Sequence, residues 1–309
     1  GQVAVVSEGP LKGKSLEQLI ERWGADLLGH RVMAVHGSQF PLLFKLLSSA
    51  QDLSLQVHPN DEQAGRMVAP GALGKTEMWV VLKADPGACL YNGFVEGYDG
   101  VDLKERTLEG RLMEVIHRCD VRAGDVFYIP SGRVHTIGAG LLIAEIQQSS
   151  DTTYRIDDFG RLDDQGNLRA LHLNEALEVM RCDGPGRPAI PQALEGLPGH
   201  LLARGPYFEC NRMAIARGEI LNRQHDGLDS LVVLMILQGV AVLDHDGGQT
   251  VVRSIETLMI PAAEPSYRIL IWVDWPTSRH CGNNIAALIR WFRPSLIEGR
   301  FHAMGLVMF

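Results

Sequence analysis

The sequence predicts a mainly β protein with two consecutive β-rich units. Most of the chain consists of short apolar or alternating runs bounded by Gly, Pro, Asn and Asp, the pattern that antiparallel strands and turns produce. This pattern occurs in the first half of the chain and again from residue 208 onward, so we expect an antiparallel barrel or sandwich in each half. The strands are predicted at 53–57, 77–82, 125–129 and 141–146, and then at 231–237, 239–243, 254–260 and 286–292.

Three stretches have the one-face apolar spacing of helices. The first follows a capping-box sequence, Ser-Leu-Glu-Gln, at 15–18 and repeats apolar residues as far as Trp23. The second lies at 112–119, and the third follows Asn174 and continues to Met180. We expect these helices at the periphery of the β structure.

A segment rich in Gly and Pro separates the two halves. These residues interrupt regular structure, so we place a linker at 183–198. The predicted domains are therefore 1–182, which carries the helical insertions, and 199–309.

Composition excludes several classes of protein. The 309 residues are 46% hydrophobic and carry a net charge of −8 with both signs interspersed, so no basic stripe for nucleic acid is present. No run approaches the roughly 20 apolar residues of a membrane helix, and no secretory signal pattern opens the chain. A cytoplasmic protein is expected, because the cysteines form no C-x-x-C pair and are odd in number. The five are Cys89, Cys119, Cys182, Cys210 and Cys281.

Residues 53–58 contain the first candidate for chemistry. Strict alternation places three apolar side chains on one face of a strand and Ser54, Gln56 and His58 on the other. A half-exposed strand has the same pattern, so this stretch alone leaves open whether the polar face meets water or a ligand.

Residues 124–135 contain the most specific motif. They read Gly-Asp-Val-Phe-Tyr-Ile-Pro-Ser-Gly-Arg-Val-His, which fits the second cupin motif, Gly-x5-Pro-x-Gly-x2-His, although Ala139 replaces its final Asn. Pro130 and Gly132 shape a tight turn, and the following strand can direct His135 into the mouth of a barrel. The alternative is that His135 is an ordinary core histidine. The motif implies two cupin-like β-barrel, or jelly-roll, domains.

The chain resembles the type I mannose-6-phosphate isomerases, in their short bacterial form. Cupin barrels usually supply a His-x-His pair and a later Glu, whereas this chain has Gln-Val-His-Pro-Asn-Asp at 56–61 and Gly-Lys-Thr-Glu at 74–77, as that family does. The stretches 40–45 and 144–155 continue the resemblance. It covers about half of the chain densely, and the second half matches the family's C-terminal β domain in pattern only.

The resemblance implies one divalent metal ion per chain, with zinc expected and manganese or cobalt as alternatives. Two imidazoles, one carboxylate and one amide oxygen suit a borderline cation and leave a position for water or substrate. In the second domain, the spacing that leads from Pro130 to His135 leads from Pro261 to Ser266, a poor ligand, so no second metal is expected. The implied ligands are Gln56, His58, Glu77 and His135.

The implied reaction interconverts mannose 6-phosphate and fructose 6-phosphate through an enediol, which requires a base that moves a carbon-bound proton. By resemblance, Glu145 is the acid/base and Arg155 holds oxygens of the intermediate or of the phosphate. Lys45 and Lys75 supply positive charge for the substrate. The alternatives are a solvated strand-end carboxylate for Glu145, a surface salt bridge for Arg155 and solvated lysines for the other two.

Two other functions remain open from the sequence. One is a cupin isomerase of glucose 6-phosphate, and the other is a non-catalytic sugar-binding or regulatory cupin. The expected partner is a small phosphosugar, without nucleic acid or membrane, and the expected state is a monomer or weak homo-oligomer. The family carries a further N-terminal segment with a strand; a chain without it is expected to have an open sheet edge and lowered activity.

Overall fold

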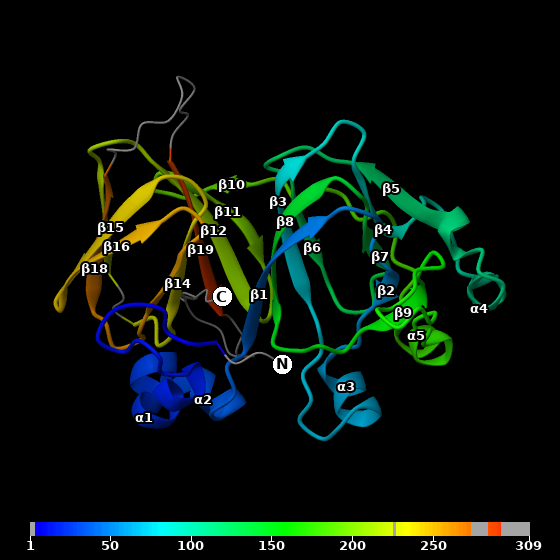
Figure 1. Cartoon of the computed structure of the whole chain (residues 1–309), viewed down its shortest axis with the longest axis horizontal. Coiled ribbons are helices and arrows are strands. Elements are labelled where there is room, and N and C mark those ends of the chain that lie inside the picture. Colours follow the sequence, from blue (N-terminus) through cyan, green and yellow to red (C-terminus); the bar gives the residue numbers. More distant parts are fainter. Residues whose placement is uncertain (1–3, 225–226, 273–283, 292–309) are drawn as a thin grey trace. The chain divides into compact units, whose positions relative to one another are not determined.

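The structure is a computed structural model that describes residues 4–224, 227–272 and 284–291 (Figure 1). The chain divides into two compact units. Unit 1 combines Gly1–Pro41 with Ile190–Phe309, and unit 2 comprises Leu42–Ala189. The N-terminal helices therefore group with the C-terminal strands, whereas the sequence analysis placed them in the first domain. The linker at 183–198 stays a prediction.

Unit 2 contains two antiparallel sheets, which agrees with the predicted mainly β fold. Neither sheet closes into a continuous hydrogen-bonded barrel within the described residues. The four-stranded sheet has the order β1 (Leu42–Ser49), β8 (Leu141–Gln148), β3 (Glu77–Ala84) and β6 (Val126–Ile129). The five-stranded sheet has the order β5 (Ile116–Asp120), β4 (Cys89–Phe94), β7 (His135–Ile137), β2 (Leu55–Val57) and β9 (Tyr154–Asp157).

The core of unit 2 lies between these two sheets. One cluster of buried apolar side chains takes Trp79 and Phe127 from the four-stranded sheet and Leu90 and Ile137 from the five-stranded sheet. The alternation of each strand directs every second side chain into this layer. The burial of these groups is the main favourable contribution to folding of the unit.

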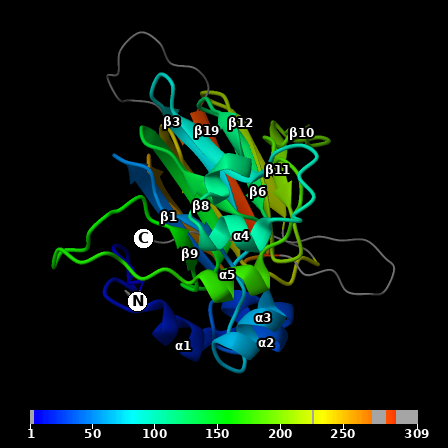
Figure 2. The same ribbon diagram turned by 90° about the vertical axis from the view of Figure 1, so that its right-hand side faces the viewer.

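The outer face of the five-stranded sheet is covered by helical segments. A second cluster joins Leu55 and Val57 of β2 to Ala176 and Val179 of α5, and α4 and α5 lie in front of the strands in Figure 2. Both faces of the sheet are therefore covered. The helical segments of unit 2 are α3 (Asp61–Met67), α4 (Leu103–Leu108), the 3-10 helix η1 (Leu112–Val115) and α5 (Leu173–Val179).

Unit 1 also contains two antiparallel sheets, as predicted for the second half of the chain. Their inner faces form one apolar cluster that includes Leu234 of β14 and Ile269 of β18. The six-stranded sheet has the order β10 (Gln192–Ala193), β11 (Gly199–Arg204), β12 (Phe208–Ile215), β19 (Asn284–Trp291), β14 (Val232–Ile236) and β17 (Thr257–Ile260). The four-stranded sheet has the order β13 (Ile220–Gln224), β18 (Ser266–Trp272), β15 (Val240–His245) and β16 (Gly248–Arg253).

Unit 1 begins with two helices, α1 (Leu16–Leu28) and α2 (His30–His36). The predicted capping box is confirmed, because Ser15 accepts a hydrogen bond from the Gln18 backbone and the Gln18 side chain accepts one from Ser15. No helix in the described part of the chain is both long enough and apolar enough to cross a membrane.

The predicted helix at 112–119 is wrong. Leu112–Val115 forms a single 3-10 turn, and Ile116–Asp120 is strand β5, which pairs with β4. Apolar residues spaced at three and four positions fit a short helix and a turn followed by a strand equally well. Pairing with β4 decides between them, because it satisfies the backbone groups of both strands.

Candidate metal centre and active site

The register of the five-stranded sheet places three predicted site residues in one row. Gln56 on β2 lies opposite His135 on β7 and, on its other side, opposite Arg155 on β9. Directly opposed residues in a sheet share a face. The polar face predicted for the first motif is therefore a site wall rather than a water-facing surface: Ser54 and His58 are buried and Gln56 is half-buried.

The four-stranded sheet supplies a second row. Glu145 on β8 lies opposite Lys45 on β1 and opposite Trp79 on β3. Two residues further along the same strands, Gln147 lies opposite Glu77. Because alternate residues of a strand share a face, Glu77 and Trp79 point to the same side, as do Glu145 and Gln147.

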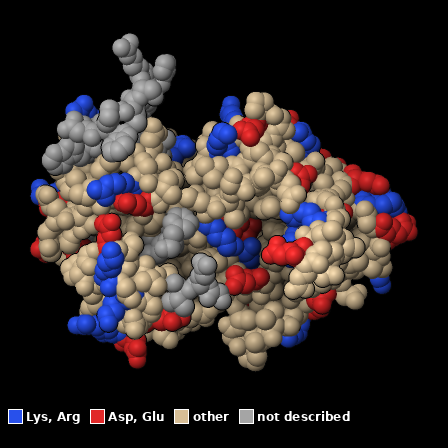
Figure 3. Space-filling view, in the orientation of Figure 1, with Lys and Arg blue, Asp and Glu red and all other residues tan. Residues whose placement is uncertain are grey.

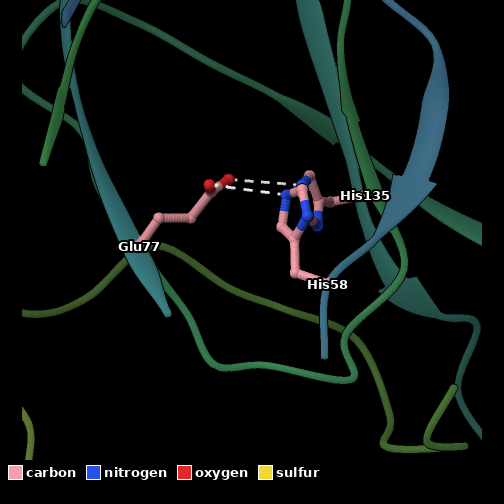
Figure 4. Close-up of side chains that lie close together, drawn as sticks. All are labelled: His58, Glu77 and His135. Atoms are coloured by element: carbon pink, nitrogen blue, oxygen red, sulfur yellow. Dashed lines mark ion pairs between the residues drawn. The ribbon is translucent and has the colours of Figure 1, made fainter. Parts of the chain in front are cut away.

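His58, Glu77 and His135 converge between the sheets (Figure 4). One ligand atom from each lies within 4.8 Å of the other two. Nε2 of His58 is 3.5 Å from one carboxylate oxygen of Glu77, and Nε2 of His135 is 3.2 Å from the other. All three side chains are at most 1% exposed. In the described part of the chain this is the one group of three such side chains.

The remaining nitrogen of each imidazole is occupied by a backbone carbonyl. Nδ1 of His58 lies 3.0 Å from the Thr152 oxygen, and Nδ1 of His135 lies 2.9 Å from the Arg133 oxygen. A carbonyl only accepts, so each Nδ1 carries a hydrogen and each ring directs its Nε2 to the cluster. This is the outer-shell arrangement that metal-ligating histidines have in proteins.

Gln56 lies beside this cluster. Its Nε2 is 3.3 Å from Nε2 of His135, and its Oε1 accepts a hydrogen bond from Ser54 at 3.3 Å. The two ends of a carboxamide have almost the same shape, so a half-turn of the group brings the oxygen to the same position. Gln56 is therefore within reach as a fourth ligand.

The donor set fits a divalent cation. Two imidazole nitrogens and a carboxylate form the set that open zinc sites use. His58 is suited to this role, because burial, followed by the charge of Lys75, lowers its pKa well below the ordinary value of 6.5. A neutral ring is the ligating form.

Lys75 contributes a buried positive charge to the same site. Its ammonium lies 2.8 Å from a Glu77 oxygen and 3.0 Å from Nε2 of His58, and the residue is 4% exposed. Burial opposes charge on both partners, but Lys75, followed by His58, lowers the pKa of Glu77 well below its ordinary range. In turn Glu77 and Glu145 raise the pKa of Lys75 against burial. Glu77 is therefore a carboxylate and Lys75 an ammonium at neutral pH.

Glu145 is held at both oxygens. Lys45 donates to Oε1 at 2.9 Å, and the Trp79 indole donates to Oε2 at 3.0 Å. Lys45 also donates to Gln147. The Trp79 ring packs edge-on against His135 with centroids 5.3 Å apart, so it connects Glu145 to the His58–Glu77–His135 cluster. The sequence analysis did not select Trp79, whose apolar surroundings in β3 are typical of a core residue.

Arg155 lies on the other side of Gln56, at a pocket of about 380 Å³. Its Nη1 donates to the Ala170 carbonyl at 2.8 Å. Burial and then the positive charge of Arg169 lower the pKa of Arg155. Arg161 and Arg169 also line the pocket, and neither was selected from the sequence. The turn-forming run Asp-Asp-Gln-Gly-Asn between them predicts only that the chain reverses there.

Asp158 joins these arginines. It is 5% exposed and accepts hydrogen bonds from Arg161 and Arg169, the latter including an Nε contact at 2.6 Å. Burial favours the neutral acid, but Arg169 and then Arg161 outweigh it and lower the pKa of Asp158 below 3.8.

The Asp158 network predicts an acid-dependent contribution to stability. A lowered folded-state pKa means that the unfolded chain binds more protons, so the contribution is present above pH 3.8 and is lost as pH falls through the folded-state value. We expect Asp158→Asn to reduce the free energy of unfolding by about 1–3 kcal/mol at pH 7, the usual range for a hydrogen bond to a charged group. Urea unfolding from pH 3 to pH 7 measures this. The difference in unfolding free energy between Asp158→Asn and wild type should become smaller in acid. The control Asp164→Asn, on the same loop, should have the unfolding free energy of wild type.

The family model that matches the chain describes the catalytic domain of type I phosphomannose isomerase and aligns with residues 2–85. A mannose-6-phosphate isomerase from Streptococcus mutans is 40% identical over 216 residues, which are 69% of this chain and 66% of that protein. Mannose-6-phosphate isomerase ManA from Bacillus subtilis is 37% identical over 231 residues, 72% of this chain and 69% of that protein.

Solved structures agree with the sequence matches. The mannose 6-phosphate isomerase of Bacillus subtilis superposes with a TM-score of 0.76 at 27% identity, covering 92% of this chain and 84% of that one. A mutant phosphomannose isomerase from Salmonella typhimurium gives a TM-score of 0.72 at 15% identity, covering 93% and 87%. The second likeness concerns the fold alone.

Proposed function

The chain belongs to the type I mannose-6-phosphate isomerase family, and on that premise we propose that it is a metal-dependent aldose–ketose isomerase of mannose 6-phosphate and fructose 6-phosphate. The observation that carries the proposal is the buried His58–Glu77–His135 cluster, with both imidazoles turned by backbone carbonyls so that Nε2 faces the carboxylate. Metal-ligating histidines usually have this arrangement, in which a hydrogen bond at the second ring nitrogen fixes the orientation of the ring.

We propose that His58, Glu77, His135 and Gln56 hold one divalent ion per chain, and that the native ion is zinc. A donor set with two imidazole nitrogens beside two oxygens favours zinc, cobalt or manganese over magnesium and calcium, which prefer all-oxygen sites. When bound, the ion supplies Lewis acidity toward the sugar oxygens.

The proton transfer is assigned to Glu145. Isomerisation removes the hydrogen from one of carbons 1 and 2 and returns it to the other, with an enediol between the two steps, so one group can act first as base and then as acid. Each carboxylate oxygen has two lone-pair positions, and Lys45 and Trp79 occupy one on each oxygen. The remaining positions can accept the carbon-bound proton while these donors keep the group in place.

The cationic side chains have different roles toward the substrate and toward Glu145. Arg155 faces the pocket beside Gln56, where its planar fork can hold two oxygens of the reacting carbons as negative charge develops. Lys75 adjoins the metal ligands and can contact a substrate hydroxyl there. Lys45 lies 2.9 Å from Oε1 of Glu145 and can hold this carboxylate in place for the proton transfer.

We place the enzyme in the cytoplasm as a monomer or weak homo-oligomer that acts on a small phosphosugar. The described cysteines are all free, as in a reducing compartment; Cys281 lies outside the described residues. On the face drawn in Figure 3, basic and acidic side chains are intermixed. This distribution is unlike the basic stripe of a nucleic-acid-binding protein.

A coupled assay tests the proposal. Purified protein should form fructose 6-phosphate from mannose 6-phosphate, lose turnover after chelation and regain it with one equivalent of zinc, cobalt or manganese per chain. Glucose 6-phosphate, offered at the same concentration, should react at least about 100-fold more slowly, because misplaced hydroxyls leave buried polar groups unpaired. Absence of metal-dependent turnover of mannose 6-phosphate would contradict the isomerase assignment.

A further inference from the structure

We propose that Arg161 and Arg169, held in position by Asp158, form the subsite for the phosphate group of the substrate. The inference deepens the proposed isomerase function and rests on it for the identity of the sugar. Both arginines line the pocket of about 380 Å³ that also contains Arg155 and Gln56.

The subsite is built into the loop that follows β9. Leu162 and Leu168 form an isolated antiparallel bridge, and this pairing brings Arg161 and Arg169, on its outer side, next to each other. In Figure 2 the segment between β9 and α5 extends away from the sheets. Asp158 holds the base of this loop together, because its carboxylate accepts hydrogen bonds from the guanidinium groups of both arginines. The two long side chains are therefore ordered before a ligand binds, which reduces the conformational entropy lost on binding.

Three guanidinium groups share this one buried carboxylate. Nε of Arg155 lies 3.9 Å from Asp158 and is buried without a hydrogen-bond partner among the described residues. The other acid at the pocket, Asp151, is exposed to solvent, which screens its charge. The pocket therefore has an excess of half-buried positive charge, and each guanidinium has five N–H donors, more than Asp158 can accept.

The lysines are less suited to the phosphate. Lys75 is paired with Glu77 at 2.8 Å and Lys45 with Glu145 at 2.9 Å, so each has a carboxylate of its own. Planar guanidinium groups also match the oxygen geometry of a phosphate better than an ammonium does. The positive charge that can bind a phosphate dianion is therefore supplied by the arginines.

The position fits a hexose 6-phosphate. Gln56 lines the same pocket and lies 3.3 Å from Nε2 of His135, so the pocket and the metal cluster share a wall. In a 6-phosphate, the phosphate is at the opposite end of the sugar from carbons 1 and 2. Binding the phosphate at Arg161 and Arg169 leaves the reacting end to extend past Arg155 toward the cluster.

Inorganic phosphate is the probe that separates this inference from the isomerase assignment, because its binding requires no turnover. Calorimetric titration of metal-loaded wild type should show phosphate binding that mannose 6-phosphate displaces. Arg161→Gln and Arg169→Gln should each weaken phosphate binding and raise the KM for mannose 6-phosphate about tenfold or more, as expected for a lost hydrogen bond to a charged group. The double variant should lose phosphate binding while its metal content is unchanged.

Asp158→Asn tests the positioning role, since its neutral side chain holds the arginines less firmly. It should raise KM and weaken phosphate binding with kcat within about threefold of wild type, a split that a general loss of structure would not produce. Arg122→Gln is the matched control: it removes the same charge from a side chain that is 90% exposed, outside the pocket, and should change nothing. Undiminished phosphate binding in the double variant, or no phosphate binding by active wild type, would overturn the proposal.

Discussion

Glu77→Gln is expected to lose both its metal and its isomerase activity while the fold is retained. Glu77 is fully buried, and its carboxylate contacts both histidines of the cluster. Glutamine has the same shape but no charge, so the cation loses its anionic ligand. Because disturbing even outer-shell partners weakens metal binding by about 10–100-fold, the loss of a direct ligand should exceed 100-fold. Metal content after dialysis and the coupled assay measure the two effects.

The same substitution leaves the Lys75 ammonium buried without its carboxylate, which can cost about 3–5 kcal/mol of stability. Lys75→Met/Glu77→Gln removes both charges and should recover part of that loss without recovering metal. Urea unfolding of the single and double variants separates the stability effect from the binding effect. Wild-type metal content in either folded variant would show that Glu77 is not a ligand.

Arg155→Ala is expected to retain the metal and lose catalysis. Arg155 lies opposite Gln56 in the sheet, but no ligand atom of the cluster belongs to it. Removal of a group that stabilises developing negative charge typically lowers kcat by about 10²–10³-fold. The coupled assay should therefore show this loss at saturating mannose 6-phosphate, together with one equivalent of bound metal.

Arg155→Lys should recover only a small part of the activity, because an ammonium keeps the charge but cannot hold two oxygens in one plane. Arg187→Ala is a suitable control, since this exposed arginine of unit 2 pairs with Glu96 and should behave as wild type. Loss of metal in Arg155→Ala would remove the distinction between binding and catalytic groups on which the mechanism depends.

Much of the site could be predicted from the sequence because the strands carry strict alternation. The alternation placed the polar residues 54, 56 and 58 on one face and left open whether that face meets water or a ligand, and the motif ending at His135 predicted a turn that can direct the imidazole into a barrel mouth. The structure brings His58, Glu77 and His135 together as the resemblance implied. The roles of Gln56 and of the predicted catalytic and substrate-binding residues stay predictions.

Other features depend on contacts between distant segments. Trp79 has the sequence environment of a core residue, and only the pairing of β3 with β8 shows that its indole meets Glu145. Arg161 and Arg169 have the ordinary appearance of loop arginines. Their common partner Asp158 becomes visible only when the bridge between Leu162 and Leu168 closes the loop.

The sequence by itself determined that the chain is mainly β, because strand periodicity is a local property, and its resemblance to a known family implied which side chains could ligate a cation. Only the tertiary structure decided that residues 112–119 form a turn and an edge strand and that residues 1–41 group with the C-terminal strands. It also decided that three arginines share one buried acid. The physical reason is that strand pairing and charge compensation depend on neighbours in space, which local periodicity does not encode.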